Sequence, residues 1–252
     1  MSGRVAIVTG AASGIGHAIS VRLAEEGARV ACLDIDAQGA AATADEVGRG
    51  AFPVATDVTD EDQIRAAIRQ VAETAGGVDV LINNAGVAGP QERAEQTPAA
   101  GWDQTQAVNL RGAFLMVKYA LPHLVRRHGA IVNIASALAF VGWPQECAYG
   151  PSKAGVVQLT KGLAVDYAPS IRVNCVCPGA VRTPMITSVL EGAPQMEVAL
   201  ADYGQIHPLH RRLALPREIA DAVLFLASDD ASFITGTALP VDGGFLAGGR
   251  GA

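Results

Sequence analysis

The sequence predicts an α/β protein: a single doubly wound domain in which a seven-stranded parallel sheet carries helices on both faces. Three observations support this fold class. Seven short apolar runs rich in Val and Ile recur along the 252 residues, stretches of helical length separate them, and no Pro- or Gly-rich linker divides the chain. Strands buried on both faces give such continuous apolar runs, and parallel sheets bury both faces. We therefore treat residues 1–252 as one domain.

The expected strands and helices alternate along the chain. The strands cover residues 5–10, 28–34, 51–57, 78–84, 129–136, 170–179 and 237–244. The helices include the stretch up to about Glu26, an Ala-rich helix after residue 34, and residues 61–75, 110–126 and 148–167. This alternation is typical of a parallel sheet. The Gly-rich tail, residues 248–252, is expected to be loose.

Composition and charge limit the classes of partner. The net charge is −6. Nucleic acid and anionic membranes both favour basic patches, so we expect neither as the main partner. The chain has no run of eighteen apolar residues and begins directly with a strand pattern, which predicts neither a membrane span nor a secretion signal. No ligand cluster accompanies the four cysteines, so we expect reduced thiols in a cytoplasmic protein.

A glycine-rich turn, TGAASGIG at residues 9–16, joins the first strand to the first helix. Its glycines are Gly10, Gly14 and Gly16, which is not the G-x-G-x-x-G spacing of the usual dinucleotide fingerprint. Glycines still permit a tight turn and a close approach of the backbone to a pyrophosphate, next to the positive end of a helix. An ordinary strand-to-helix turn explains the pattern equally well.

Asp34 favours the dinucleotide interpretation. It ends the second strand, 18 residues beyond Gly16, where an acid accepts hydrogen bonds from the adenosine ribose. A 2′-phosphate there would be repelled by about 4 kcal/mol at ~4 Å and an effective dielectric near ~20. No Arg or Lys follows within the next residues, and Ser13 in the turn is uncharged. We therefore predict NAD in preference to NADP, although a plain strand-end Asp remains an alternative.

Two more strand ends fit a cofactor lying across the sheet. Asp57 and Val58 follow the third strand and are placed to contact an adenine. The sequence NNAG at residues 83–86, which contains Asn84, follows the fourth strand. Asn is a turn former in any protein, so this second signal is modest when it stands alone.

The stretch AYGPSKAGVV, from residue 148, predicts an acid–base pair at the start of a helix. Lys153 lies one helical turn after Tyr149, on the same face, and Pro151 is tolerated in a first turn. A nearby cation lowers the pKa of a phenol from its ordinary value of about 10. Tyr149 is thus expected to exchange a proton with an alcohol or ketone, while Ser136, after the fifth strand, donates to the same oxygen.

Taken together, these motifs resemble those of the short-chain dehydrogenase/reductase family. They are T-G-x-x-x-G-I-G at 9–16, N-N-A-G at 83–86, Ser136, Y-x-x-x-K at 149–153 and P-G at 178–179. The resemblance runs from about residue 3 to residue 245 and implies a Rossmann-type domain, commonly assembled as a homotetramer. The family often has Ala or Thr in place of Pro151, and a glycine in place of Ala139.

The resemblance implies roles for individual residues. The catalytic set would be Asn109, Ser136, Tyr149 and Lys153. Lys153 would also bind the nicotinamide ribose, and Asn109 would belong to a proton relay through water. The implied cofactor contacts are Gly10, Ser13, Gly14, Ile15, Gly16, Asp34, Asp57, Val58, Asn84, Ala85, Gly86, Tyr149, Lys153, Pro178, Gly179, Val181 and Thr183.

The substrate side is expected to come from three variable segments, residues 87–93, 137–147 and 184–212. The last reads as an amphipathic lid, although most of its apolar residues are expected simply to be part of the core. The candidate pocket residues are Ala137, Trp143, Gln145, Glu146 and Met185. Trp143 with Phe140 favours a small apolar or alicyclic ketone, whereas Gln145 and Glu146 favour a polyol or sugar. The pair His207 and His210 indicates a metal only faintly, since no third ligand is apparent, and we expect none.

The favoured function is that of an NAD-dependent enzyme that interconverts a secondary alcohol and a ketone. One alternative is a 3-oxoacyl-[acyl-carrier-protein] reductase, against which Asp34 and the net charge of −6 both weigh. Another is a non-catalytic dinucleotide sensor, which would be expected to lack an intact set of Ser136, Tyr149 and Lys153.

Overall fold

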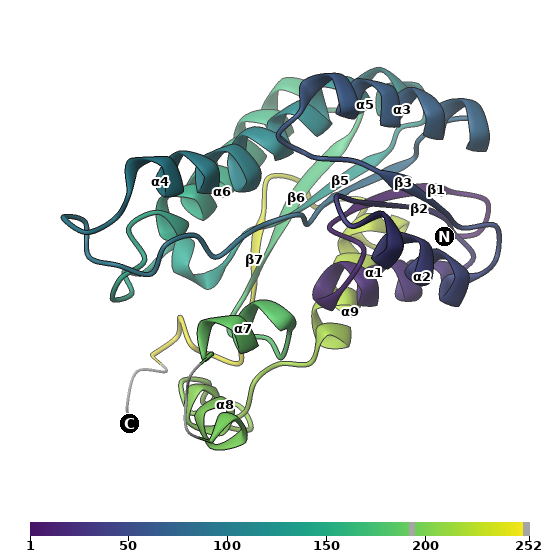
Figure 1. Ribbon diagram of the computed structural model, residues 1–252. Helices are drawn as coiled ribbons and strands as arrows, with labels where there is room; N and C mark the ends of the chain where they lie inside the picture. The colour runs from purple at the N-terminus through teal and green to yellow at the C-terminus, as the bar shows by residue number, and fades with distance from the viewer. Residues whose placement is uncertain (192–194, 249–252) are drawn as a thin grey trace.

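The computed structural model describes residues 1–191 and 195–248 as a seven-stranded, fully parallel sheet in the order β3-β2-β1-β4-β5-β6-β7 (Figure 1). The strands are β1 (Val5–Thr9), β2 (Arg29–Asp34), β3 (Phe52–Ala55), β4 (Val80–Asn83), β5 (Ala130–Ile134), β6 (Arg172–Pro178) and β7 (Ala238–Val241). The predicted fold class and all seven predicted strands are confirmed.

Helices cover both faces of the sheet (Figure 1). One layer holds α1 (Gly14–Glu25), α2 (Ala37–Val47) and α9 (Pro216–Ala227). The other layer holds α3 (Glu61–Ala75), α4 (Ala99–Gln106), the π-helix η1 (Ala107–Gly112), α5 (Ala113–Arg126) and α6 (Tyr149–Tyr167). The 3-10 turns η2 (Ala137–Ala139) and η3 (Asp229–Ala231) follow β5 and α9.

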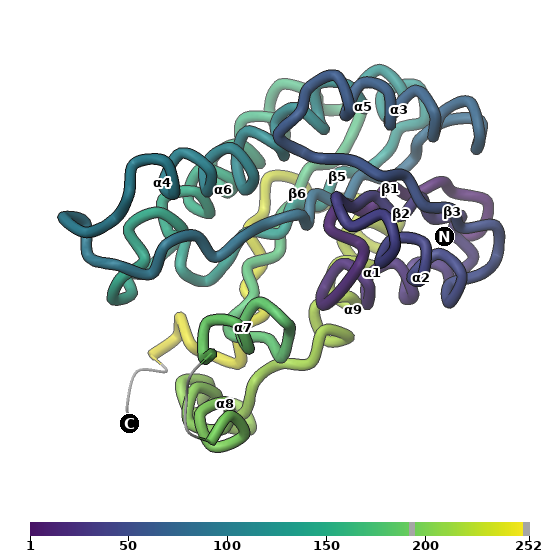
Figure 2. The backbone as a smooth tube through the Cα atoms, viewed as in Figure 1, coloured from purple at the N-terminus to yellow at the C-terminus, as the bar shows by residue number. Residues whose placement is uncertain are grey.

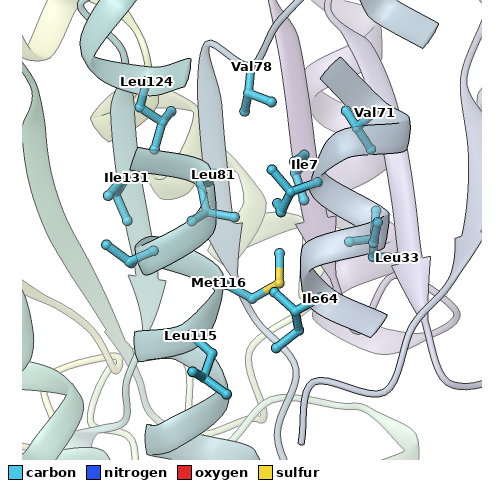
Figure 3. Close-up of a cluster of buried hydrophobic side chains, with 14 of the residues drawn as sticks. Ile7, Leu33, Ile64, Val71, Val78, Leu81, Leu115, Met116, Leu124 and Ile131 are labelled. Atoms are coloured by element: carbon cyan, nitrogen blue, oxygen red, sulfur yellow. The ribbon is translucent and has the colours of Figure 1, made fainter. Parts of the chain in front are cut away.

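Each helical layer closes a separate apolar core against the sheet. On one side Ile64 and Val71 of α3 and Met116 of α5 pack over Ile7 and Leu81 (Figure 3). On the other side, residues of α1 and α9 pack over the remaining side chains of the same strands. Strand β1 is buried along its whole length, as a central strand covered on both faces must be.

The strand order reverses beside β1, which pairs with β2 on one edge and β4 on the other. The crossovers to its two neighbours therefore run on opposite faces of the sheet, and a crevice opens beyond the carboxyl ends of the strands at this point. The glycine turn after β1 and the pair of asparagines at the end of β4, Asn83 and Asn84, both lie at this switch point. The fold thus brings together motifs that are more than 70 residues apart in sequence.

The segment after β6 lies outside the two helical layers, as Figure 2 shows. It forms α7 (Pro184–Val189) and α8 (Met196–Gly204). Leu200 and Leu213 pack with Ala180 in a small cluster of their own, so part of the predicted lid makes its own core. The lid interpretation itself stays a prediction. Residues 192–194 of this segment, and residues 249–252 of the predicted loose tail, lie outside the described residues.

None of the helices formed by the described residues is long and apolar enough to cross a membrane.

Candidate active site

A cleft of about 430 Å³ follows the carboxyl ends of the strands from β2 to β6. Every residue predicted to contact the cofactor lines it except Gly16. Ile35 and Gln104, which the sequence did not single out, line it as well. Ile35 is apolar and 72% exposed.

The glycine turn forms the floor of this cleft. Gly10 and Gly14 have φ values of +65° and +56°, which glycine adopts without strain. Gly16 is buried beneath the turn, where an added Cβ would lie 2.0 Å from the carbonyl oxygen of Gly10. Gly16 does not line the cleft, and its predicted contact with the cofactor stays a prediction. Its role is to let α1 pack tightly against the turn.

A hydrogen-bond network around Thr9 holds the turn against β4. The Thr9 hydroxyl accepts hydrogen bonds from the backbone N–H groups of Asn84 and Ala85, both at 3.0 Å. The Asn84 side chain donates to the carbonyl oxygens of Thr9 and Gly10, at 2.9 and 3.1 Å. The Asn84 amide thus shapes the cleft by positioning its floor. Thr9 begins the motif at residues 9–16, but the motif alone did not indicate this role for its hydroxyl.

Asp34 lies on the same cleft, and two backbone N–H groups hold its carboxylate. Its Oδ2 accepts from Ala12 at 2.9 Å, and its Oδ1 accepts from Asp36 at 3.0 Å. Both bonds fix the side chain in one orientation at the end of β2. Each carboxylate oxygen keeps a further lone pair that can accept from a ligand hydroxyl.

The donors and acceptors of the cleft fit a dinucleotide. The first amides of α1 face it, and the preceding residue, Ser13, makes no side-chain cap to them. Uncapped N–H groups at the positive end of a helix suit phosphates. Asp34, an acceptor, suits ribose hydroxyls. The strand-end residues between them would hold the remainder of the cofactor, which would supply hydride acceptance and delivery when bound.

Tyr149, Lys153 and Ser136 meet at the inner end of the cleft. Tyr149 is the first residue of α6 and Pro151 lies in its first turn, as predicted. The Lys153 side chain is buried, and its Nζ donates to the carbonyl oxygen of Ile134 at 2.9 Å. The same Nζ lies 5.5 Å from the centre of the Tyr149 ring. The Ser136 hydroxyl accepts from the N–H of Leu138 at 3.1 Å, which orients it beside the tyrosine.

The acid–base properties differ from the sequence-based expectation. Burial raises the pKa of Tyr149 to about 12, and the hydrogen bond with Ser136 lowers it only in part. Burial lowers the pKa of Lys153 to about 8. The pKa of Tyr149 is therefore raised, not lowered as its spacing to Lys153 led us to expect. The loss of hydration of the Tyr149 hydroxyl dominates its pKa, because the nearby Lys153 ammonium is directed to the carbonyl oxygen of Ile134.

Asn109 lies in the π-helix η1, where one extra residue turns its side chain toward the loop after β4. Its Oδ1 accepts from the N–H of Val87 at 2.8 Å, and its Nδ2 donates to the Val87 carbonyl oxygen at 3.0 Å. Nδ2 also donates to the hydroxyl of Ser152 at 3.0 Å. Asn109 thus clamps this loop to α6 from behind Gly86. Its role in a proton relay stays a prediction.

A second cavity of about 80 Å³ opens on the other side of Tyr149. Ser136, Tyr149 and Met185 line both this cavity and the cofactor cleft. Its further walls come from the loop after β4, from residues 137–146, from α7 and α8, and from the chain after β7. The two spaces therefore meet at the predicted catalytic residues.

Four of the five predicted substrate residues line this cavity: Ala137, Trp143, Glu146 and Met185. Gln145 does not line this cavity, and a substrate contact for it stays a prediction. A φ of +64° turns the chain there, and the exposed Gln145 lines a separate open depression. Phe140 lies in the same depression and is 47% exposed, so it does not wall the cavity either.

The sequence missed two aromatic walls of the cavity. The rings of Tyr203 and Phe245 pack edge-on against Trp143, with centroids 6.2 and 5.9 Å away. Each comes from a different part of the chain, and no local pattern indicates that they converge.

His207 has a structural role. Its Nε2 accepts from the N–H of Ala180 at 3.0 Å, and its Nδ1 lies 2.8 Å from the Arg212 carbonyl oxygen, to which it donates. This positions the loop after β6 that borders both cavities. Within residues 1–191 and 195–248 no three side chains of the ligand types gather into a metal site.

Comparison with known proteins agrees with this arrangement. A family model described as enoyl-(acyl carrier protein) reductase matches residues 10–246. The chain belongs to the short-chain dehydrogenase/reductase family. It is 44% identical to 2-(R)-hydroxypropyl-CoM dehydrogenase of Xanthobacter autotrophicus, over 97% of this chain and 99% of that protein. It is 43% identical to cis-4-hydroxycyclohexanecarboxylate dehydrogenase of Sinomonas cyclohexanicum, over 97% of each.

Among solved structures, levodione reductase is similar to this short-chain dehydrogenase/reductase with a TM-score of 0.93 and 36% identity, covering 98% of this chain and 99% of that one. Membership of the family makes the protein an oxidoreductase that uses a nicotinamide dinucleotide.

Proposed function

We propose that this protein is an NAD-dependent dehydrogenase that oxidises a small secondary alcohol to a ketone and catalyses the reverse reduction. One observation carries the proposal: Tyr149 and Ser136 stand where the cofactor cleft and the smaller cavity meet. An alcohol in the smaller cavity would present its hydroxyl to both side chains and its carbinol hydrogen to the cleft.

The proposed roles follow from the chemistry of the groups. Tyr149 takes the alcohol proton during oxidation and returns it during reduction. Ser136 donates a hydrogen bond to the same oxygen as its charge changes. Lys153, with a pKa near 8, can be charged or neutral at working pH and is placed to pass a proton on. Asn109 keeps the loop and α6 in register behind them.

We propose NAD over NADP because of Asp34. Its carboxylate is held in the cleft by two N–H groups and cannot turn away without breaking them. Lys153 is the only Lys or Arg among the described residues that line the cleft, and it lies at the Tyr149 end, so a 2′-phosphate beside Asp34 would have no cation to bind.

The acyl-carrier alternative fits less well. The second cavity is small, and a net charge of −6 disfavours an acidic carrier protein as partner. The sensor alternative is weakened by the family relatives, which are dehydrogenases, and by the intact set of Ser136, Tyr149 and Lys153.

A panel of secondary alcohols tests the proposal, each assayed with NAD and with NADP by nicotinamide absorbance. We expect NADH formation with a subset of small alcohols and a weaker rate with NADP. A preference for NADPH with 3-oxoacyl thioesters would support the acyl-carrier alternative instead. No turnover across the panel, with NAD still binding, would support the sensor.

We also propose a homotetramer in the cytoplasm, in keeping with the habit of the family. Exposed apolar side chains such as Phe114 on α5 and Val165 on α6 are consistent with subunit contacts. Light scattering on the purified protein would measure the mass, and a monomer would refute this assembly.

A further inference from the structure

The smaller cavity contains a carboxylate that the protein itself only half satisfies. Oε1 of Glu146 accepts a hydrogen bond from Nε2 of Gln91 at 3.1 Å. Oε2 is shielded from water, and no donor of the described residues reaches it. Glu146 lies three residues before Tyr149 and lines the same cavity.

Such a group is costly to a folded protein. A buried acceptor without a partner destabilises the native state, and a buried carboxylate does so more strongly. The backbone nevertheless holds Glu146 in place: it pairs with Glu92 across an isolated bridge, and its carbonyl oxygen accepts from the N–H of Gly150. The side chain therefore remains at the cavity wall, a position suited to a ligand group that completes its hydrogen bonds.

The surroundings define that group. The walls around Glu146 are largely apolar and aromatic, including Trp143, Tyr203 and Phe245. No Lys or Arg is found among the described residues that line the cavity. An anionic substrate would meet an uncompensated like charge, whereas a hydroxyl on an apolar body would fill the space and donate to the Glu146 carboxylate.

We propose that Glu146 is a specificity-determining residue that accepts a hydrogen bond from a second hydroxyl of the substrate. The preferred substrate is then a small neutral diol with an apolar carbon body, one hydroxyl on Tyr149 and the other on Glu146. This inference rests on the proposed function for the first hydroxyl. The sequence left open whether the substrate is an apolar ketone or a polyol. The proposed diol has the apolar carbon body of the first and the second hydroxyl of the other.

Matched substrate pairs test the inference. The pairs are cyclohexanol with cyclohexane-1,2-diol and butan-2-ol with butane-2,3-diol, and 3-hydroxybutyrate serves as the anionic probe. We expect wild-type kcat/KM to be higher for each diol than for its mono-ol, and lowest for 3-hydroxybutyrate. 2-Aminocyclohexanol distinguishes an amine donor from a hydroxyl donor, and a preference for it over the diol would overturn the assignment to a hydroxyl.

The decisive variant is Glu146→Met, which keeps the length of the side chain and removes both acceptors. The ratio of kcat/KM for diol over mono-ol should fall by about 10- to 100-fold, the effect of losing one hydrogen bond to a charged group. In Glu146→Gln the same ratio should fall less, because the amide oxygen can still accept a hydrogen bond from the hydroxyl. Glu92→Gln is the matched control: it removes an exposed carboxylate outside the cavity and should leave the ratio unchanged.

Two further readouts separate the possible failures. Calorimetry with NADH present measures diol and mono-ol binding without turnover. If both wild type and Glu146→Met turn over alcohols with the same ratio of kcat/KM for diol over mono-ol, this inference is overturned. The proposed dehydrogenase function would then still stand. Tighter diol binding that Glu146→Met abolishes, without any turnover, would support the inference and refute the proposed function. A large loss of thermal stability in Glu146→Met would show a structural role for Glu146 and contradict the inference.

Discussion

The two cavities that meet at Tyr149 are built in different ways. The cofactor cleft is made from the ends of neighbouring strands, and its floor is fixed by backbone hydrogen bonds such as those around Thr9 and Asp34. The smaller cavity is made from loops and short helices that follow β4, β5, β6 and β7. The sheet therefore determines the first cavity, whereas the contacts of aromatic side chains determine the second.

The difference teaches that reaction chemistry and substrate choice have separate structural origins here. The carboxyl ends of parallel strands lie at the same edge of the sheet regardless of the sequence of the loops. The proposed acid–base residues and cofactor contacts therefore keep their positions. The loops can change without disturbing them. A change at the sheet edge should then damage binding and stability together, while a change in the smaller cavity should alter specificity alone.

The largest expected effect comes from Gly16→Ala. Its new Cβ would overlap the Gly10 carbonyl oxygen, so the turn must move, at a cost of about 3 kcal/mol or more in the free energy of unfolding. Cofactor affinity should fall in parallel. Urea unfolding and an NAD titration measure the two effects.

The matched control is Gly162→Ala, in an exposed part of α6 where nothing lies within 4 Å of the added Cβ. It should gain about 0.5–1 kcal/mol of stability without altering NAD binding. Equal effects of the two substitutions would show that the glycine turn is not held tightly.

Ser136→Ala should lower kcat by about 10²- to 10³-fold, because one preorganised donor to the reacting oxygen is lost. NAD affinity should stay within about twofold, since the hydroxyl faces the junction of the two cavities. Ser136→Thr, which retains a hydroxyl, should recover part of the rate. A fall in NAD affinity as large as the fall in kcat would contradict the separation of the two cavities.

Asp34→Ala should reduce the preference for NAD, measured as the ratio of kcat/KM with NAD and with NADP, by about 10- to 100-fold. The substitution removes the repulsion between the Asp34 carboxylate and the 2′-phosphate of NADP. Solvent screens this repulsion at the half-exposed site, which limits the gain in kcat/KM with NADP. Asp34→Asn separates charge from hydrogen bonding, because its amide oxygen can still accept from the backbone. An unchanged ratio in both variants would refute Asp34 as the discriminator.

The smallest effect concerns the dependence of stability on pH. Lys153 has a folded pKa of about 8 against an ordinary value of 10.5, so the unfolded chain binds more protons between these values. The free energy of unfolding should therefore rise with pH across that window, through this group. Lys153→Met should remove the rise, which urea unfolding at several pH values detects. The same slope in both proteins would show that the amine is well hydrated.

The sequence predicted the cleft well because short spacings determine it. Gly10, Asp34 and Lys153 each follow a strand or a helix start at a fixed distance, and parallel strands bring those ends together. Gly16 lies beneath the turn and not on the cleft, which the sequence did not indicate because it does not separate a glycine that faces a ligand from one that permits packing. The pKa of Tyr149 was also misjudged, since burial cannot be read from the spacing to Lys153.

The smaller cavity was predicted only in part. Trp143 and Glu146 lie in the segment just before Tyr149, close enough in sequence to be assigned to the site. Tyr203 and Phe245 reach it through tertiary packing over long separations, which leaves no periodic signal. Gln145 lies outside it, because a positive φ value at this residue directs the side chain to the surface.

The most direct test of the central claim is the turnover of Tyr149→Phe on any alcohol that the wild type oxidises. The phenyl ring keeps the packing and loses the hydroxyl that we propose exchanges the proton. The account predicts that kcat/KM falls by about 10³-fold or more while NAD binds within about threefold of wild type. Turnover close to the wild-type rate would contradict it, because the proton would then be leaving through another group.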